Sequence, residues 1–167
     1  MPKNATPATA KDFLEEAVRL AIEGMRKGHG GPFGAVIVKD GEIVGKSYNR
    51  GFQKCDPTAH AEVEAIRDAC KKLNTPELAG CTIYSSGEPC PMCMGAIYWA
   101  QMDAVVFANS KELSEGTGFD DRKIYKELAL PWKSRALSMS QLELYSAKAA
   151  FKEWQEKMAA ETARQMS

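Results

Sequence analysis

The chain has 167 residues, of which 44% are hydrophobic and 26% are charged. This composition provides enough apolar side chains for a buried core and excludes a wholly disordered chain. The 22 basic and 22 acidic residues give a formal net charge of +0. The excess positive charge typical of nucleic-acid-binding proteins is absent, so a nucleic-acid partner is not expected.

The sequence predicts neither a membrane protein nor an exported one. It has no apolar run of about 18 residues, the length that a transmembrane helix needs. Residues 1–10 lack the apolar core of a signal peptide. A cytoplasmic protein is therefore expected, in which the five cysteines are reduced and serve as metal ligands, nucleophiles or small buried side chains.

Hydrophobic spacing predicts the secondary structure elements in chain order. Residues 1–10 are polar and are expected to be flexible. Apolar residues recur at helical spacing over 11–27. Residues 33–47 predict two short strands joined at Asp40-Gly41, because both central positions of such a turn favour a positive φ.

Helices and strands are expected to alternate through the rest of the chain. After a loop over 49–58, the predicted elements are a helix over 59–72, a strand over 81–85, a helix over 90–99, a strand over 104–108, and helices over 122–128 and 144–163. Asp56 and Thr58 are the candidate N-caps of the first of these helices. The alternation predicts a layered α/β fold, with residues 11–167 forming a single domain.

Two segments contain residues that can bind a metal. The first is His60-Ala-Glu62 and the second is Cys90-Pro-Met-Cys93, each at the start of a predicted helix. The Cys-x-x-Cys pair alone is compatible with a thioredoxin-type redox site or with structural zinc, which needs a fourth protein ligand. The remaining candidates for that ligand are Cys55, Cys70, Cys81 and His29. None of them lies at a recognisable ligand spacing.

Together the two segments predict a catalytic zinc site. One histidine and two cysteines provide three ligands, which leaves the fourth position for water. Both thiols lie at the start of a helix, where unpaired N–H groups and the helix dipole favour the thiolate. Glu62 is close enough to exchange a proton with that water without binding the metal. The H-x-E and P-C-x-x-C motifs are the signature of zinc deaminases.

The resemblance extends beyond the metal-binding motifs. From Phe13 to about Glu127 the chain resembles the small bacterial-type guanine deaminases of the cytidine deaminase-like superfamily, through the stretches GGPFGAVIVKDG, DPTAHAEV, EPCPMC, GAIYWA and GFDD. The resemblance implies a zinc-dependent deaminase domain with a three-layer α/β/α fold and a five-stranded mixed sheet. It also implies one Zn²⁺ per subunit, a nucleobase substrate and a homodimer that exchanges its C-terminal segments.

The family pattern assigns roles to the matching residues of this chain. The zinc ligands would be His60, Cys90 and Cys93. Glu62 would carry protons, and Asp121 would reach the partner's site and assist proton transfer at the leaving amine. The substrate-binding residues would be Asn49, which hydrogen-bonds the purine, Phe33, which stacks on it, and also Trp99, Ala61 and Asp120.

Several of these residues also have an ordinary structural interpretation. Asn49 fits a turn after a strand, and Phe33 and Trp99 fit a hydrophobic core. Asp120 and Asp121 fit the N-terminal cap of the helix that follows them. The sequence leaves these alternatives open.

The chain departs from the family pattern in two places. Gly87 stands where related deaminases often have a cysteine, which removes a side chain beside the site. The tail over 159–167 has no terminal tyrosine of the kind that closes the site in related enzymes. The three other cysteines, Cys55, Cys70 and Cys81, are expected to be inert buried thiols.

The expected reaction is the hydrolytic deamination of guanine to xanthine and ammonia, with an activated water attacking C2 of the base. The alternatives within the same chemistry are another small base or nucleoside (guanosine, isocytosine, cytosine or a triazine) and the adenosine of a tRNA. Residues 111–167 contain nearly equal numbers of basic and acidic side chains, which offers little to an RNA. A non-enzymatic domain held together by zinc is the third alternative.

Overall fold

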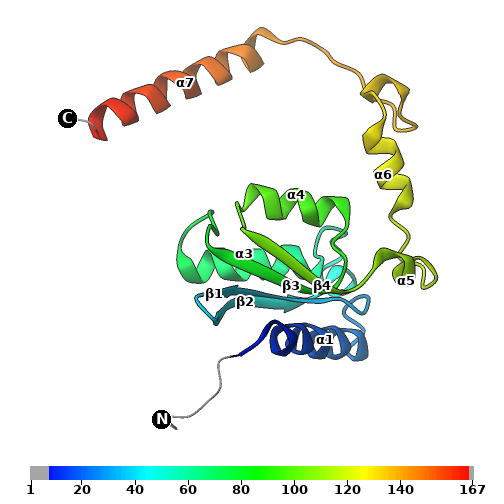
Figure 1. Ribbon diagram of the computed structural model, residues 1–167. Coiled ribbons are helices and arrows are strands. Elements are labelled where there is room, and N and C mark those ends of the chain that lie inside the picture. The colour runs from blue at the N-terminus through cyan, green and yellow to red at the C-terminus, as the bar shows by residue number, and fades with distance from the viewer. Residues whose placement is uncertain (1–7, 166–167) are drawn as a thin grey trace. The chain divides into compact units, whose positions relative to one another are not determined.

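The computed structural model describes residues 8–165 (Figure 1). The chain divides into two compact units, and the boundary along the sequence lies between Tyr125 and Lys126. We describe each unit by itself. Of the N-terminal segment that was predicted to be flexible, residues 1–7 lie outside the described residues. Thr9, just before the first helix, forms a reciprocal capping box with Asp12.

The first unit contains a four-stranded mixed sheet. Its strands lie in the order β2 (Glu42–Tyr48), β1 (Gly34–Lys39), β3 (Cys81–Gly87) and β4 (Ala104–Asn109). β1 is antiparallel to both of its neighbours, whereas β3 and β4 are parallel. The prediction of a mixed sheet is confirmed. The prediction of five strands is wrong for residues 8–165, because the described chain after β4 forms only helices and connecting segments.

Helices cover both faces of this sheet. Helix α1 (Ala10–Arg26) packs on one face, and α3 (Ala61–Leu73) and α4 (Pro91–Trp99) lie on the other (Figure 1). The layered α/β fold predicted from the alternation of elements is therefore confirmed, as is the three-layer α/β/α arrangement that the resemblance implied. None of the helices described between residues 8 and 165 is both long and apolar enough to cross a membrane.

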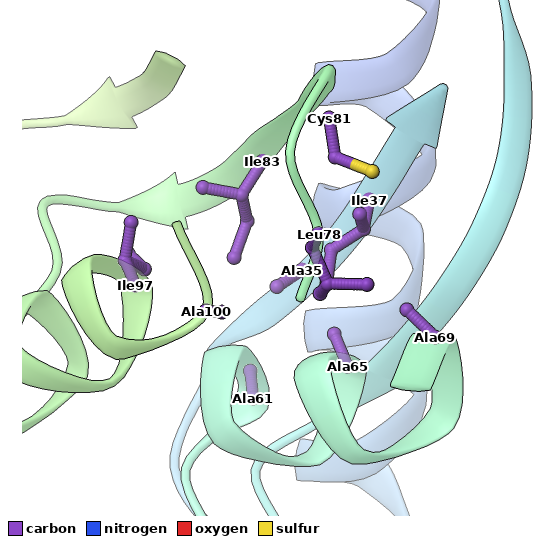
Figure 2. Packing of buried hydrophobic residues seen from close by; sticks show 10 residues of the cluster. All are labelled: Ala35, Ile37, Ala61, Ala65, Ala69, Leu78, Cys81, Ile83, Ile97 and Ala100. Carbon is purple, nitrogen blue, oxygen red and sulfur yellow. The ribbon is translucent and has the colours of Figure 1, made fainter. Parts of the chain in front are cut away.

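Side chains of β1 alternate between the two layers of helices. Ala35 and Ile37 belong to the larger buried cluster, which also contains residues of α3 and α4 (Figure 2). Val36 and Val38 point to the opposite face, where they join a cluster with residues of α1. This alternation is the two-residue period of a strand that is buried on both sides.

Small side chains bring α3 close to the sheet. Ala61, Ala65 and Ala69 recur every four residues and line the side of α3 that faces the core (Figure 2). Gly45 of β2 lies directly against this stripe, since a Cβ there would be 2.6 Å from the carbonyl oxygen of Ala65. The tight contact fixes the axis of α3, and with it the position of its first turn.

The turns and caps follow the sequence with one exception. Asp40 and Gly41, between β1 and β2, have φ values of 51° and 80°, so the predicted hairpin is confirmed. The N-cap of α3 is His60. The prediction that Asp56 or Thr58 caps this helix is wrong, because the Asp56 carboxylate accepts hydrogen bonds from the main chain and hydroxyl of Thr58 instead.

Three short elements were not predicted. The expected loop over 49–58 contains α2 (Gly51–Lys54), and the chain after β4 forms α5 (Lys111–Glu115). The 3₁₀ helix Trp132–Ser134 lies later in the chain. The predicted helix over 122–128 is confirmed as α6 (Arg122–Ala129). Elements of three to five residues carry too few periodic positions for a hydrophobic pattern to register.

The second unit, residues 126–165, consists mainly of the end of α6 and the long helix α7 (Tyr145–Gln165). The predicted helix over 144–163 is confirmed. The described part of α7 buries no residue. Large apolar side chains are exposed throughout this unit, among them Leu137, Leu142, Tyr145, Phe151 and Trp154.

Candidate active site

The predicted metal ligands lie at the starts of two neighbouring helices. His60 is the N-cap of α3 and Cys90 is the N-cap of α4, and both have the extended backbone of that position. Cys93 follows in the first turn of α4 and is fully buried. Pro91 begins α4 without the N–H that would lack a partner there, and its fixed φ favours the helix.

The three ligands form one cluster with the dimensions of a zinc site. Nδ1 of His60 lies 3.6 Å from Sγ of Cys90 and 3.5 Å from Sγ of Cys93, and the two sulfurs are 3.6 Å apart. With Zn–S of about 2.3 Å and Zn–N of about 2.0 Å, a tetrahedral zinc would separate sulfur from nitrogen by about 3.5 Å and the sulfurs by about 3.8 Å. The donor set therefore fits zinc.

Within residues 8–165, no fourth side chain of a metal-binding type joins this group. Cys70 and Cys81 lie elsewhere, half-buried on α3 and buried in β3. The prediction that Cys55 is buried is wrong, because it lies exposed at the end of α2 in a left-handed conformation. Three protein ligands with an open position are typical of catalytic rather than structural zinc.

Hydrogen bonding already favours a charged sulfur in this cluster. The hydrogen bond with Cys93, followed by the contact with His60, lowers the pKa of Cys90 to about 4. The hydrogen bond with Cys90 likewise raises the pKa of His60. Cys90 is thus prepared to bind a cation as a thiolate.

Glu62 lies beside the cluster in a dry environment. Its side chain is only 4% exposed, and burial raises the pKa of the carboxyl group. The hydroxyl of Ser85 donates a hydrogen bond of 3.0 Å to Oε1, and Cys93 donates one of 3.4 Å to Oε2. These contacts fix a carboxyl group of raised pKa within reach of the cluster, which suits a proton carrier.

Ser85 was missed by the sequence analysis, although the sequence contains a signal for it. It lies on β3 two residues after Ile83 and four after Cys81, so the period of the strand places all three on the same buried face. A hydroxyl group at a core position of a strand needs a hydrogen-bond partner, and Glu62 is that partner.

A cavity of about 530 Å³ opens in front of the cluster. It is lined by side chains that the sequence singled out, namely Phe33, Asn49, His60, Glu62, Cys90, Asp120 and Asp121. Two predicted substrate-binding residues do not line it. Ala61 is buried in the core against the sheet, and Trp99 is 87% exposed on the surface of α4.

Asn49 is buried and rigidly held. Its main-chain N–H donates to the carbonyl of Phe33 at 2.9 Å, and its Oδ1 accepts from the N–H of Gly51 at 3.0 Å. Gly30 packs so closely against the amide that any side chain there would displace it. Asn49 therefore stabilises the turn after β2 and also lines the cavity.

Phe33 is part of an aromatic pair that the sequence did not predict. Its ring meets the ring of Phe119 edge-to-face, with centroids 5.0 Å apart and an interplanar angle of 86°. A Cβ on Gly87 would lie 3.3 Å from the Phe33 ring. The Gly87 departure thus leaves space behind this ring, where the cysteine of related enzymes would press.

The two adjacent aspartates have different surroundings. The carboxylate of Asp120 accepts hydrogen bonds from the main chain and the guanidinium of Arg122, at the start of α6. The main-chain carbonyl of Asp121 accepts the first bond of that helix, from Ile124. Burial, followed by the charge of Cys90, raises the pKa of Asp121. Asp121 lines the cavity of its own chain.

The fold and the cluster define a zinc-dependent deaminase. Residues 7–109 match the cytidine and deoxycytidylate deaminase zinc-binding region, and the chain belongs to this family. A guanine deaminase of Bacillus subtilis is 50% identical over 142 residues, which cover 85% of this chain and 91% of the relative. The crystal structure of a guanine deaminase from that species has a TM-score of 0.86 at 48% identity, over 89% of this chain and 95% of that one.

Other members of the family are more distant. A guanine deaminase structure from Nitrosomonas europaea has a TM-score of 0.64 at 28% identity, covering 71% of this chain and 68% of that chain. A tRNA-specific adenosine deaminase of Aquifex aeolicus is 46% identical over 96 residues, which are 58% of this chain and 63% of the relative. The tRNA-acting relative therefore matches a smaller part of the chain than the Bacillus subtilis enzyme does.

Proposed function

We propose that the chain is a zinc-dependent hydrolase that deaminates guanine to xanthine and ammonia. The observation that carries the proposal is the three-ligand cluster with the buried carboxyl of Glu62 beside it, at the base of a cavity of about 530 Å³. The match to the guanine deaminase of Bacillus subtilis, over most of both chains, supports guanine as the substrate.

His60, Cys90 and Cys93 would hold the zinc, which acts as a Lewis acid and acidifies the attacking water when it is bound. Glu62 would accept the proton of that water, and its raised pKa suits it to release the proton again. The hydrogen bond from Ser85 keeps Oε1 in place, so Oε2 is the oxygen that points toward the cluster.

The cavity walls would orient the base. The Asn49 amide presents a donor and an acceptor side by side, which matches the O6 and N1–H edge of guanine. Phe33 would stack on the ring, and Asp121 would deliver a proton to the leaving 2-amino group. Ala61 would take part only through its main-chain N–H, which has no acceptor within α3 because it belongs to the first residue of the helix.

Substrate choice can be measured directly. The zinc-loaded protein is incubated with guanine, guanosine, cytosine and adenine, and released ammonia is quantified. We expect guanine to give the highest kcat/KM. Deamination of a tRNA anticodon stem-loop without turnover of guanine would overturn the proposal, and zinc binding without any ammonia release would favour a non-enzymatic domain.

Two substitutions test the guanine-specific part. Asn49→Ala leaves polar groups of the base unpaired, a loss of about 1–3 kcal/mol that should appear mainly as a higher KM. Asp121→Asn keeps the volume of the side chain but removes the carboxylate, so it should mainly lower kcat. Both are measured by steady-state kinetics with zinc content as the control. If both variants deaminate guanine like the parent, the guanine assignment fails.

We infer further that the chain forms a homodimer through its C-terminal unit. From Leu128 to Trp154 this unit exposes many large apolar side chains, which is more than an isolated chain normally leaves in water. The first unit also exposes Tyr98 and Trp99 on α4.

A further inference from the structure

We propose that Phe119 is a positioning residue that holds Asp121 at the active site by docking its ring against Phe33 and Gly31. This inference rests on the proposed function, since it concerns the residue proposed to donate a proton to the leaving group. Phe119 comes from the GFDD stretch, of which only the two aspartates were given a role above.

The ring of Phe119 spans two segments that are far apart in the sequence. It meets Phe33 edge-to-face at 5.0 Å, and both rings line the cavity. The Phe119 segment otherwise lies on the surface between α5 and α6. Its ring joins this segment to Phe33 and Gly31, which lie just before β1.

Gly31 is the surface on which the ring rests. A Cβ at this position would lie 2.5 Å from Cζ and 2.8 Å from Cε1 of Phe119, distances that side chains do not reach. The ring tip thus occupies the space that any other residue at position 31 would fill. The contact between Phe119 and Gly31 should therefore be lost either when the ring is removed or when a side chain is added at position 31.

The docked ring constrains the carboxylate two residues later. Gly118, just before Phe119, has a φ of 89°, a backbone conformation that favours glycine and lets the chain turn sharply. After it, Asp120 is tied to Arg122 by three hydrogen bonds. Asp121 therefore lies between a helix start on one side and the docked ring on the other, and it lines the cavity.

The experiment compares two ways of undocking the ring. Phe119→Ala removes the ring, and Gly31→Ala keeps it but blocks its resting place. Gly116→Ala is the matched control, because it adds the same methyl group to the Phe119 segment where no atom lies within 4 Å. For each protein, kcat and KM for guanine are measured alone and in combination with Asp121→Asn.

We expect Phe119→Ala and Gly31→Ala each to lower kcat by about 10-fold or more, as misplacement of a catalytic group does, while zinc content stays unchanged. In a protein that already carries Asp121→Asn, the same two substitutions should lower kcat by less than about 2-fold, because the carboxylate that they misplace is already gone. Gly116→Ala should match the parent. If each double variant loses kcat by the product of the two single losses, the proposal is overturned, because Phe119 would then act independently of Asp121.

A second readout does not depend on turnover. Amide hydrogen exchange of a peptide covering residues 116–125 reports the N–H groups of Arg122, Ile124 and Tyr125, which bond to the two aspartates. Exchange should be faster in Phe119→Ala and Gly31→Ala than in the parent and in Gly116→Ala. Unchanged exchange in Gly31→Ala overturns the docking itself. If the two variants exchange faster than the parent but the parent does not deaminate guanine, the docking is retained and the proposed function is rejected.

Discussion

Glu62 and the metal ligands are neighbours with separate roles, and one substitution at Glu62 separates them. Glu62→Gln keeps the size of the side chain and an oxygen that can accept from Ser85, but it cannot take up a proton. We expect normal zinc content and melting temperature with kcat lower by on the order of 10²–10⁴-fold. Metal analysis and steady-state kinetics on one preparation measure both. Loss of zinc would identify Glu62 as a ligand, and unchanged kcat would mean that another group carries the proton.

Cys90 has no substitute in the cluster, because the described part of the chain brings three protein ligands together and no fourth. Cys90→Ser replaces a soft thiolate by a neutral hydroxyl and should lose zinc and activity together. Cys70→Ser is the matched control, since Cys70 is a half-buried thiol of α3 outside the cluster. Zinc per chain is measured after dialysis at neutral pH. Stoichiometric zinc in Cys90→Ser would show that the ligand set is wrong.

Among single residues, the sequence predicted those that lie in short motifs and missed those whose role depends on contacts with distant segments. The ligands and Glu62 lie in short motifs, whose residue types and spacing predict a zinc site with an activated water, while the resemblance supplied the deamination. Phe119 was missed because its contacts come from Gly31 and Phe33, on a distant segment, and nothing in the GFDD stretch itself indicates them. Trp99 was assigned to the pocket by position on its helix, but the helix directs it away from the cavity.

Among the secondary structure elements, α1 and β2 are connected by a small network of charges. Glu16 of α1 accepts hydrogen bonds from Arg19 at 2.6 Å and from Lys46 of β2 at 3.0 Å. The hydrogen bond from Arg19, together with that from Lys46, lowers the pKa of Glu16 to about 2. A carboxyl whose pKa is depressed on folding stabilises the protein above its ordinary pKa, and the stabilisation is lost as pH falls through the folded value.

Glu16→Gln should therefore lower the stability at pH 7 by at most about 1 kcal/mol, because the partners are partly exposed. The difference from the parent should persist down to about pH 4.5 and shrink toward pH 2. Glu15→Gln is the control, since Glu15 lies on the exposed side of the same helix. Urea unfolding of the parent, Glu16→Gln and Glu15→Gln at several pH values measures the difference in the free energy of unfolding. A difference that is constant down to pH 2 would contradict the assigned ion pairs.

The longer elements were predictable because each carries enough periodic positions to show which face is buried. The hairpin was predictable for a different reason, since Asp-Gly specifies its turn directly. Helices α2 and α5 span a single turn and depend on neighbouring segments rather than on their own pattern. The fifth strand was expected from the family, and the described chain after Asn109 shows none.

For the molecule as a whole, the question is which chain supplies Asp121 to each site. The cavity of one chain already contains Glu62, Cys90 and Asp121. If the proposed homodimer forms through residues after Tyr125, each site should still draw both Glu62 and Asp121 from the same chain. The exchange implied by the resemblance predicts the opposite, with Asp121 crossing to the partner.

Mixed dimers distinguish the two arrangements. A Glu62→Gln chain and an Asp121→Asn chain, each with its own affinity tag, are co-expressed and purified over both tags in turn. When both groups come from one chain, each site of the mixed dimer lacks one of them, so the activity should stay at the level of the two variant homodimers. When Asp121 crosses over, one site in each mixed dimer becomes intact and about half of the parental activity should return. A mixed dimer of the parent chain with Glu62→Gln calibrates that half-activity. Failure to recover any protein over both tags would contradict the homodimer itself.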